Sequence, residues 1–429
     1  MKRPPIVESR DRSALAGLYA PGWAPNEDVV ASVTKILRDV RSRGDEALCD
    51  YARRFDDPSF TLERLRVPLP SLEEARTFVP SDVAAGLQLA RERVLAFHAR
   101  QRIPDMEYDE RDGSRYAVLV RPLASIGAYV PGGTASLPSS AIMTTVPAKL
   151  AGVERVVVAT PPMRGERGVN PAILFACVLC GVDELYAVGG AQAIAALAYG
   201  TSKIAPVDKI VGPGSVWVTE AKRQVFGVVG IDGLAGPSEV LVVADESSQP
   251  ELVAGEMLAQ AEHDAYARVA TVSASRDMLE RVSDVLASSP QTQRSEIVSR
   301  VFDERAWLIH ARNDEEILEV IDRFAPEHLS IQTREPMRFV PRVRHAGAIF
   351  VGPSTPVAAG DYIAGTNHVL PTAGAARFAS GLRLADFMRT MSLVEYSDAR
   401  MQQDADVLAS LADFEGLPAH AQSARMRKR

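Results

Sequence analysis

Hydrophobic residues recur with a helical period through the first hundred residues of the chain. The repeat is clearest at Val29, Val30, Val33, Ile36, Leu37 and Val40, and residues 87–98 show a similar pattern. This spacing places apolar side chains on one face of a helix, so residues 26–100 are predicted to be mainly helical. Residues 115–130 (RYAVLVRPLASIGAYV) are instead predicted to be extended, up to the break at Pro131-Gly132-Gly133.

The middle third alternates between short β-branched runs and helical runs. Strands are predicted at 153–161, 182–189 and 207–212, and helices at 171–181, 190–200 and 215–227. Two successive units have the order strand, Val-Gly, small or turn residue, helix. This order is typical of a parallel, doubly wound sheet.

A second α/β segment follows, with strands predicted at 240–246, 269–275 and 346–352 and helices at 250–263 and 277–287. We therefore expect an α/β protein with two nucleotide-fold-like (Rossmann-like) parallel-sheet domains and helical extensions at both ends. The last 45 or so residues are predicted to be mostly helical. Residues 404–424 have too little apolar mass to fold alone, which favours docking on another surface, such as a second subunit.

We expect the chain to have four parts. We expect an N-terminal arm at 1–25 and a discontinuous substrate domain at 26–125 and 237–381. A cofactor domain is expected at 126–236, and a helical tail that docks on a partner subunit in an intertwined dimer at 382–429.

Composition narrows the class of protein. Of the 429 residues 46% are hydrophobic and 24% charged, and the formal net charge of −7 argues against a nucleic-acid partner. Three cysteines rule out a disulfide framework and suit a reducing cytoplasm, and we interpret the pair Cys177 and Cys180 as buried apolar residues. No apolar run approaches 18 residues and no signal-peptide stretch is present, so we expect a cytoplasmic protein without a membrane partner.

Two glycine turns are candidates for cofactor binding. Gly189-Gly190 and Gly212-Pro213-Gly214 each separate a predicted strand from a predicted helix. Glycine there allows a phosphate to approach the N–H groups at the helix start. The alternative is that such turns need glycine for geometry alone, and the G-x-G-x-x-G fingerprint is absent.

Three polar pairs are candidates for catalysis or metal binding. Gln260 and His263 lie three apart, so on a helix both face the same way. Glu327-His328 offers a carboxylate beside an imidazole, the minimum for proton transfer at neutral pH. Asp361 and His368 lie in a stretch punctuated by glycine and proline. Each has an ordinary alternative: a polar helix end, a solvated loop pair, or a turn stabilised by its own side chains.

Taken together, these stretches resemble the histidinol dehydrogenase family over nearly the whole chain. Eight segments in the family's order carry the resemblance: Gly127-AYVPGGTA, Val188-GGAQAIAALAYG, Val211-GPG, Ala235-GPSEVLV, Gln260-AEHD, Pro326-EHL, Gly360-DYIAGTNHVLPT and Glu415-GLPAHA. The family oxidises L-histidinol to L-histidine through L-histidinaldehyde with two NAD, the last step of histidine biosynthesis. The same activity is therefore expected here.

The resemblance also implies the metal and the catalytic groups. One zinc ion would be bound by four residues that also line the substrate site: Gln260, His263, Asp361 and, from a second subunit of a homodimer, His420. His328, also at the substrate, would be the general base of the hydride-transfer steps. Glu327 would activate the water that attacks the aldehyde.

The remaining implied roles concern substrate and cofactor. Ser238, His368 and Glu415 would contact the substrate, and Tyr129 and Gln192 would contact NAD. Two positions depart from the family's pattern. Ser215, in the cofactor site, stands where Asn is common, and Val357 stands where Glu is usual.

Two rival functions remain open. One is a related zinc- and NAD-dependent dehydrogenase that acts on another small alcohol, such as a sulfonated diol. It would be expected to lose some of the signatures that begin at Gly236, Pro326, Gly360 and Glu415, and all four are present. The other is a non-catalytic nucleotide-binding protein, which loss of a metal ligand or of the Glu-His pair would favour. None of these residues is lost.

Overall fold

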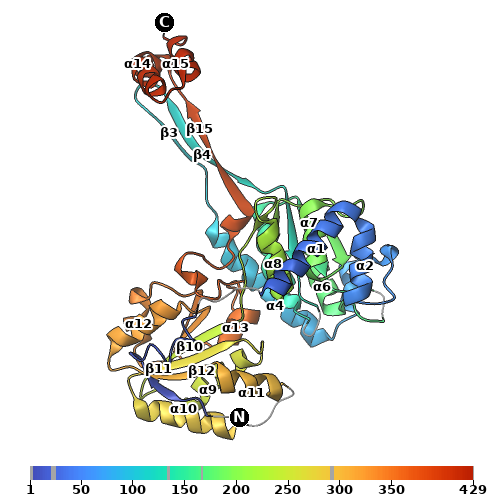
Figure 1. The fold of residues 1–429 in the computed structure, drawn as a ribbon, viewed down its shortest axis with the longest axis vertical. Coiled ribbons are helices and arrows are strands. Elements are labelled where there is room, and N and C mark those ends of the chain that lie inside the picture. Colours follow the sequence, from blue (N-terminus) through green and yellow to red (C-terminus); the bar gives the residue numbers. More distant parts are fainter. Residues whose placement is uncertain (1–2, 21–25, 133–135, 166–167, 290–293, 429) are drawn as a thin grey trace.

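The computed structural model describes residues 3–20, 26–132, 136–165, 168–289 and 294–428. They form two six-stranded sheets, each covered by helices, and a separate three-stranded sheet (Figure 1). The expected α/β class with two parallel-sheet domains is confirmed. Parts of the expected arm (1–2 and 21–25) and the end of the first motif (133–135) lie outside the described residues.

The first sheet has the order β2-β7-β6-β5-β8-β9. Its strands are β2 (Arg66–Val67), β5 (Ser125–Tyr129), β6 (Arg155–Thr160), β7 (Glu184–Ala187), β8 (Lys209–Val211) and β9 (Gly230–Ile231). All pair in parallel except β2, which is antiparallel to β7. The chain continues from β5 to β6 on one side and later returns to place β8 on the other. The carboxyl ends of β5 and β8 therefore flank the point where the strand order reverses, the usual place for a ligand in such sheets.

Helices from two regions of the chain cover this first sheet. They are α1 (Glu27–Arg43), α2 (Asp45–Phe55), α3 (Leu72–Arg76), α4 (Ser81–His98), α5 (Pro138–Ala151), α6 (Pro171–Leu179), α7 (Gly190–Tyr199) and α8 (Val216–Val225). The stripe of α1 packs in one core with residues of α7 and α8, and α4 shares a core with α5 and α6. Cys177 and Cys180 are buried in the latter core, as predicted.

The position of residues 26–98 differs from our expectation. We assigned them to the domain of residues 237–381, but their apolar faces pack on the sheet of residues 125–231. Periodicity identifies which face of a helix is buried and carries no information about the surface that buries it.

The second sheet is parallel throughout, in the order β1-β12-β11-β10-β13-β14. Its strands are β1 (Ile6–Glu8), β10 (Glu239–Ala244), β11 (Arg268–Ser273), β12 (Ala306–His310), β13 (His328–Ile331) and β14 (Ala348–Val351). Its helices are α9 (Pro250–Ala261), α10 (Arg276–Ser288), α11 (Ser295–Glu304), α12 (Asp314–Phe324) and α13 (Val357–Tyr362). Strands β10, β11 and β14 were expected, whereas β1, β12 and β13 were not.

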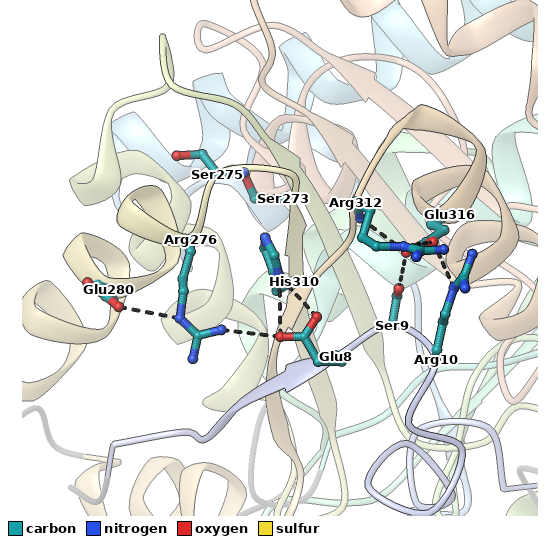
Figure 2. Close-up of polar contacts among 10 residues, drawn as sticks. All are labelled: Glu8, Ser9, Arg10, Ser273, Ser275, Arg276, Glu280, His310, Arg312 and Glu316. Carbon is teal, nitrogen blue, oxygen red and sulfur yellow. Dashed lines mark hydrogen bonds and ion pairs between the residues drawn. The ribbon is translucent and has the colours of Figure 1, made fainter.

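The N-terminal arm is fastened to this sheet by a polar network at the carboxyl ends of β1 and β12 (Figure 2). The ring of His310 lies with Nδ1 3.0 Å from a carboxylate oxygen of Glu8. Glu316 accepts hydrogen bonds from the Ser9 hydroxyl at 2.5 Å and from the guanidinium Nε of Arg10 at 2.9 Å and of Arg312 at 2.7 Å. His310 therefore contacts the N-terminal arm.

The C-terminal tail differs in part from the expected helical segment. Strand β15 (Met388–Glu395) pairs antiparallel with β4 (Arg115–Pro122), which pairs with β3 (Met106–Asp109). This ribbon carries α14 (Asp398–Phe414) and α15 (Pro418–Arg425) away from both large sheets (Figure 1). The two helices share only a small alanine core, and Phe414 is 92% exposed. Docking of the tail on a partner stays a prediction.

Candidate active site

Glu327 and His328 lie at the amino end of β13, inside the molecule. His328 is 3% exposed, and its Nδ1 lies 2.9 Å from the carbonyl oxygen of Glu239 at the start of β10. Its Nε2 lies 3.8 Å from Oδ1 of Asp361. Burial lowers the pKa of His328 to about 4, so the imidazole is neutral at physiological pH. A neutral imidazole with one nitrogen already bonded can use the other as a proton acceptor.

Glu327 is buried beside this imidazole. Its Oε2 accepts the N–H of Glu239 at 3.0 Å and lies 3.7 Å from His328 Nδ1. Burial raises the pKa of Glu327 well above its ordinary value. The backbone turns just before the pair, where Ala325 has a φ of 49°. Glu327 and His328 therefore lie together at the amino end of β13. In a straight strand, adjacent side chains would point to opposite faces of the sheet.

The candidate metal ligands of one chain lie around His328. Gln260 lies in the last turn of α9, His263 follows this helix, and Asp361 lies on α13. Asp361 Oδ1 lies 3.8 Å from His328 Nε2, and His263 adds to the lowering of the His328 pKa that burial causes. Burial raises the pKa of Asp361 to about 6 and lowers the pKa of His263. A neutral imidazole is the form that binds a metal.

The structure also tests whether these residues fit a zinc ion. Gln260 is 3% exposed, and its Nε2 has no hydrogen-bond partner among the described residues. A buried, unpaired amide is costly, and turning it by 180° offers its oxygen to a cation instead. The described residues hold no group of three His, Cys, Asp or Glu that could bind a metal. One chain supplies only two such residues here, His263 and Asp361, beside an amide, so the residues fit an incomplete site that needs a further ligand.

His368 joins the two large domains at this site. Its Nδ1 donates to the carbonyl oxygen of Asp361 at 2.9 Å, and its Nε2 lies 3.2 Å from the hydroxyl of Ser140 on α5. Both ring nitrogens thus have partners, so a substrate would meet the ring or displace Ser140. Ser238 precedes β10 and is half-buried, with its carbonyl accepting the N–H of Arg268 at 3.0 Å.

Two predicted site residues lie elsewhere in the chain. Glu415 and His420 are exposed on α14–α15, at the far end of the ribbon from α9 and α13 (Figure 1). They cannot reach the other candidates within one chain. The structure therefore brings together Gln260, His263, Glu327, His328, Asp361 and His368 and leaves these two apart.

The predicted cofactor residues lie at the carboxyl edge of the first sheet. The Tyr129 hydroxyl, at the end of β5, accepts the N–H of Gly190 at 3.1 Å. Gln192 lies in the first turn of α7, and Ser215 is the N-cap of α8. Gly212 has a φ of 110°, and a Cβ there would lie 2.2 Å from the Tyr129 carbonyl oxygen, so this turn requires glycine. Binding of NAD at these residues stays a prediction.

Three charged residues were not predicted from the sequence. Glu239 and Arg268 lie behind His328, and Asp56 lies beside the predicted cofactor residue Gln192. Glu239 is completely buried and forms an ion pair with Arg268, while Asp56 lies 3.4 Å from the Gln192 amide. Burial raises the pKa of Asp56 to about 6. The sequence did offer one indication of the buried ion pair: Glu239 stands at the start of the apolar run Glu239-VLVV. A charge in a buried strand needs a partner of opposite charge.

No helix in the described part of the chain is both long and apolar enough to cross a membrane.

The model of the family described as histidinol dehydrogenase matches residues 23–428. A histidinol dehydrogenase from Gluconobacter oxydans is 45% identical, covering 96% of each chain, and one from Heliobacterium mobile is 44% identical, covering 93% of this chain and 94% of that one. The crystal structure of histidinol dehydrogenase from Elizabethkingia anophelis superposes with a TM-score of 0.92, at 31% identity over 100% of this chain and 98% of that one. The chain belongs to the histidinol dehydrogenase family.

Proposed function

We propose that this protein oxidises L-histidinol to L-histidine through L-histidinaldehyde, with two NAD and one zinc ion per site. Membership of the family makes it an NAD-linked oxidoreductase of histidine biosynthesis. The single observation that supports the chemistry best is the buried His328, whose Nδ1 is held by Glu239 and whose Nε2 faces Asp361.

Within this proposal His328 removes protons from oxygen. Its Nε2 accepts the hydroxyl proton of the alcohol as the first hydride departs and releases this proton to solvent. It then accepts a hydroxyl proton of the hydrated aldehyde as the second hydride departs. The hydrogen bond of Nδ1 to the backbone of β10 holds the ring, so the base needs no reorientation between steps. NAD, when bound, accepts each hydride.

Glu327 serves the step between the two oxidations. Its carboxylate accepts a proton from the water that attacks the aldehyde carbon. Burial raises its pKa, which makes the deprotonated carboxylate a stronger base than that of an exposed glutamate.

Gln260, His263 and Asp361 would hold the zinc ion, which when bound would orient the amine and imidazole of the substrate. The fourth ligand, His420, and the substrate contact Glu415 would come from a second copy of the chain. This is supported by the tail, which projects from the body with its apolar residues exposed. The protein would then act as a homodimer with shared sites.

The direct test follows NADH formation when purified protein meets L-histidinol. We expect two NADH per histidinol, loss of activity with a chelator, and recovery with zinc. A sulfonated diol oxidised in place of histidinol would instead identify the related dehydrogenase. Activity that survives complete removal of metal would refute the zinc assignment.

A further inference from the structure

A single hydrogen bond joins the two helices that carry the candidate metal ligands. Oε2 of Glu256, on α9, accepts the backbone N–H of Val357, the first residue of α13, at 3.1 Å. Glu256 is only 9% exposed, and it has no part in the proposed proton transfers. A buried carboxylate is costly unless it is bonded, so this contact is a specific feature of the fold.

The position of the bond relates it to the metal site. Gln260 follows Glu256 by one helical turn on α9, and Asp361 follows Val357 by one turn on α13. The bond therefore ties the first residue of α13 to α9 one helical turn before each of these two residues. Helix α13 has only six residues, and its N-cap, Pro356, provides no side-chain hydrogen bond. Glu256 supplies the acceptor that this helix start otherwise lacks.

We infer that Glu256 is a positioning residue that sets the zinc affinity by holding the Asp361 helix in register with Gln260. This inference rests on the proposed zinc site. Its test compares zinc dissociation constants of the full-length protein, measured by competition with a chelator, and uses variants on both sides of the bond.

Glu256→Ala removes the acceptor, and Val357→Pro removes the N–H donor. Proline is tolerated at the first position of a helix, and the preceding Pro356 already has the extended ψ of 149° that a following proline requires. We expect both variants to bind zinc roughly tenfold more weakly, the loss of one charge-assisted hydrogen bond.

Two matched variants keep the bond. Glu256→Gln retains an acceptor oxygen. Val357→Ala retains the backbone N–H but removes the valine side chain, as Val357→Pro also does. We expect both to bind zinc within about threefold of the unmodified protein, a difference smaller than that of a lost hydrogen bond. The Tm of each metal-free variant is measured as well. Weaker zinc binding at an unchanged Tm indicates that only the position of α13 has changed, whereas a large fall in Tm indicates general loss of stability.

The outcomes are distinct. Unchanged zinc affinity in Glu256→Ala or Val357→Pro would overturn the inference. It would also be overturned if Glu256→Gln bound zinc as weakly as Glu256→Ala, because the role of Glu256 would then be purely electrostatic. If the unmodified protein binds no zinc, the proposed function fails first, and this inference fails with it.

Discussion

The Nδ1 atom of His328 lies 2.9 Å from the carbonyl oxygen of Glu239. A carbonyl oxygen only accepts, so Nδ1 carries the hydrogen and Nε2 presents its lone pair toward Asp361. The parallel pairing of β10 with β13, in which Val240 lies opposite His328, sets this relationship. The tautomer of the candidate base is thus determined by sheet register.

The first prediction concerns this base. His328→Asn should lower kcat by about 10²–10⁴-fold, because no group remains to take the alcohol proton. Zinc content and Tm should stay near those of the unmodified protein. His345→Asn is the control, since His345 bonds only the Asp322 carbonyl outside the site. A near-normal rate for His328→Asn would refute the assignment.

The second prediction concerns the shared site. His263→Ala and His420→Ala should each be inactive, and a mixture reassembled from equal amounts should recover about a quarter of the normal activity. Half of the dimers are then hybrids, each with one intact site. Mixing His263→Ala with His328→Asn provides the control, because both residues come from the same subunit and no intact site forms. Verified hybrids without activity would contradict a site shared between subunits.

The third prediction concerns Asp56 beside Gln192. Its pKa is raised from 3.8 to about 6 by burial, so the folded state disfavours the charged form. The resulting loss of stability develops as pH rises from about 4 through 6 and is constant above. Asp56→Asn should therefore raise stability by roughly 1–3 kcal/mol at pH 8 and by little at pH 4. Denaturant unfolding at both pH values measures this, and an equal effect at both would contradict it.

The fourth prediction concerns the network in Figure 2. The Ser9 hydroxyl, followed by the Arg312 backbone N–H, lowers the pKa of Glu316 from 4.5 to about 2. Its contribution to stability is complete above pH 4.5 and is lost as pH falls toward 2. Glu316→Gln should lower the Tm by roughly 2–4 °C at pH 7, and the difference should narrow with acid.

The same variant should free the N-terminal arm, because two of its residues, Ser9 and Arg10, bond Glu316. Limited trypsin digestion should then cut at Arg10 or Arg12 sooner. Glu315→Gln is the matched control, since Glu315 bonds the exposed Arg342 outside the arm. Equal digestion of both variants would show that other contacts hold the arm.

Much of the architecture could be predicted locally. The alternation around 153–227 and 240–287 predicted β6 to β8, α6 to α10 and two parallel sheets, because parallel strands buried on both faces are continuous apolar runs. Strands β1, β12 and β13 were not predicted, because each has only three to five residues and, unlike the equally short β8 and β14, is not followed by a glycine. β15 escaped because its partner β4 lies more than 250 residues earlier in the chain.

The sequence by itself determined the family, the element types and the residue types available for chemistry, since these depend on local pattern and on ordered motifs. Only the tertiary structure decided which surfaces meet. It placed α1 and α4 on the first sheet, brought Asp361 to His328, buried Glu239 behind the base and carried His420 away from it. The physical reason is that burial, charge pairing and ligand geometry arise between segments far apart in the chain, and periodicity reports the face of an element without naming its partner.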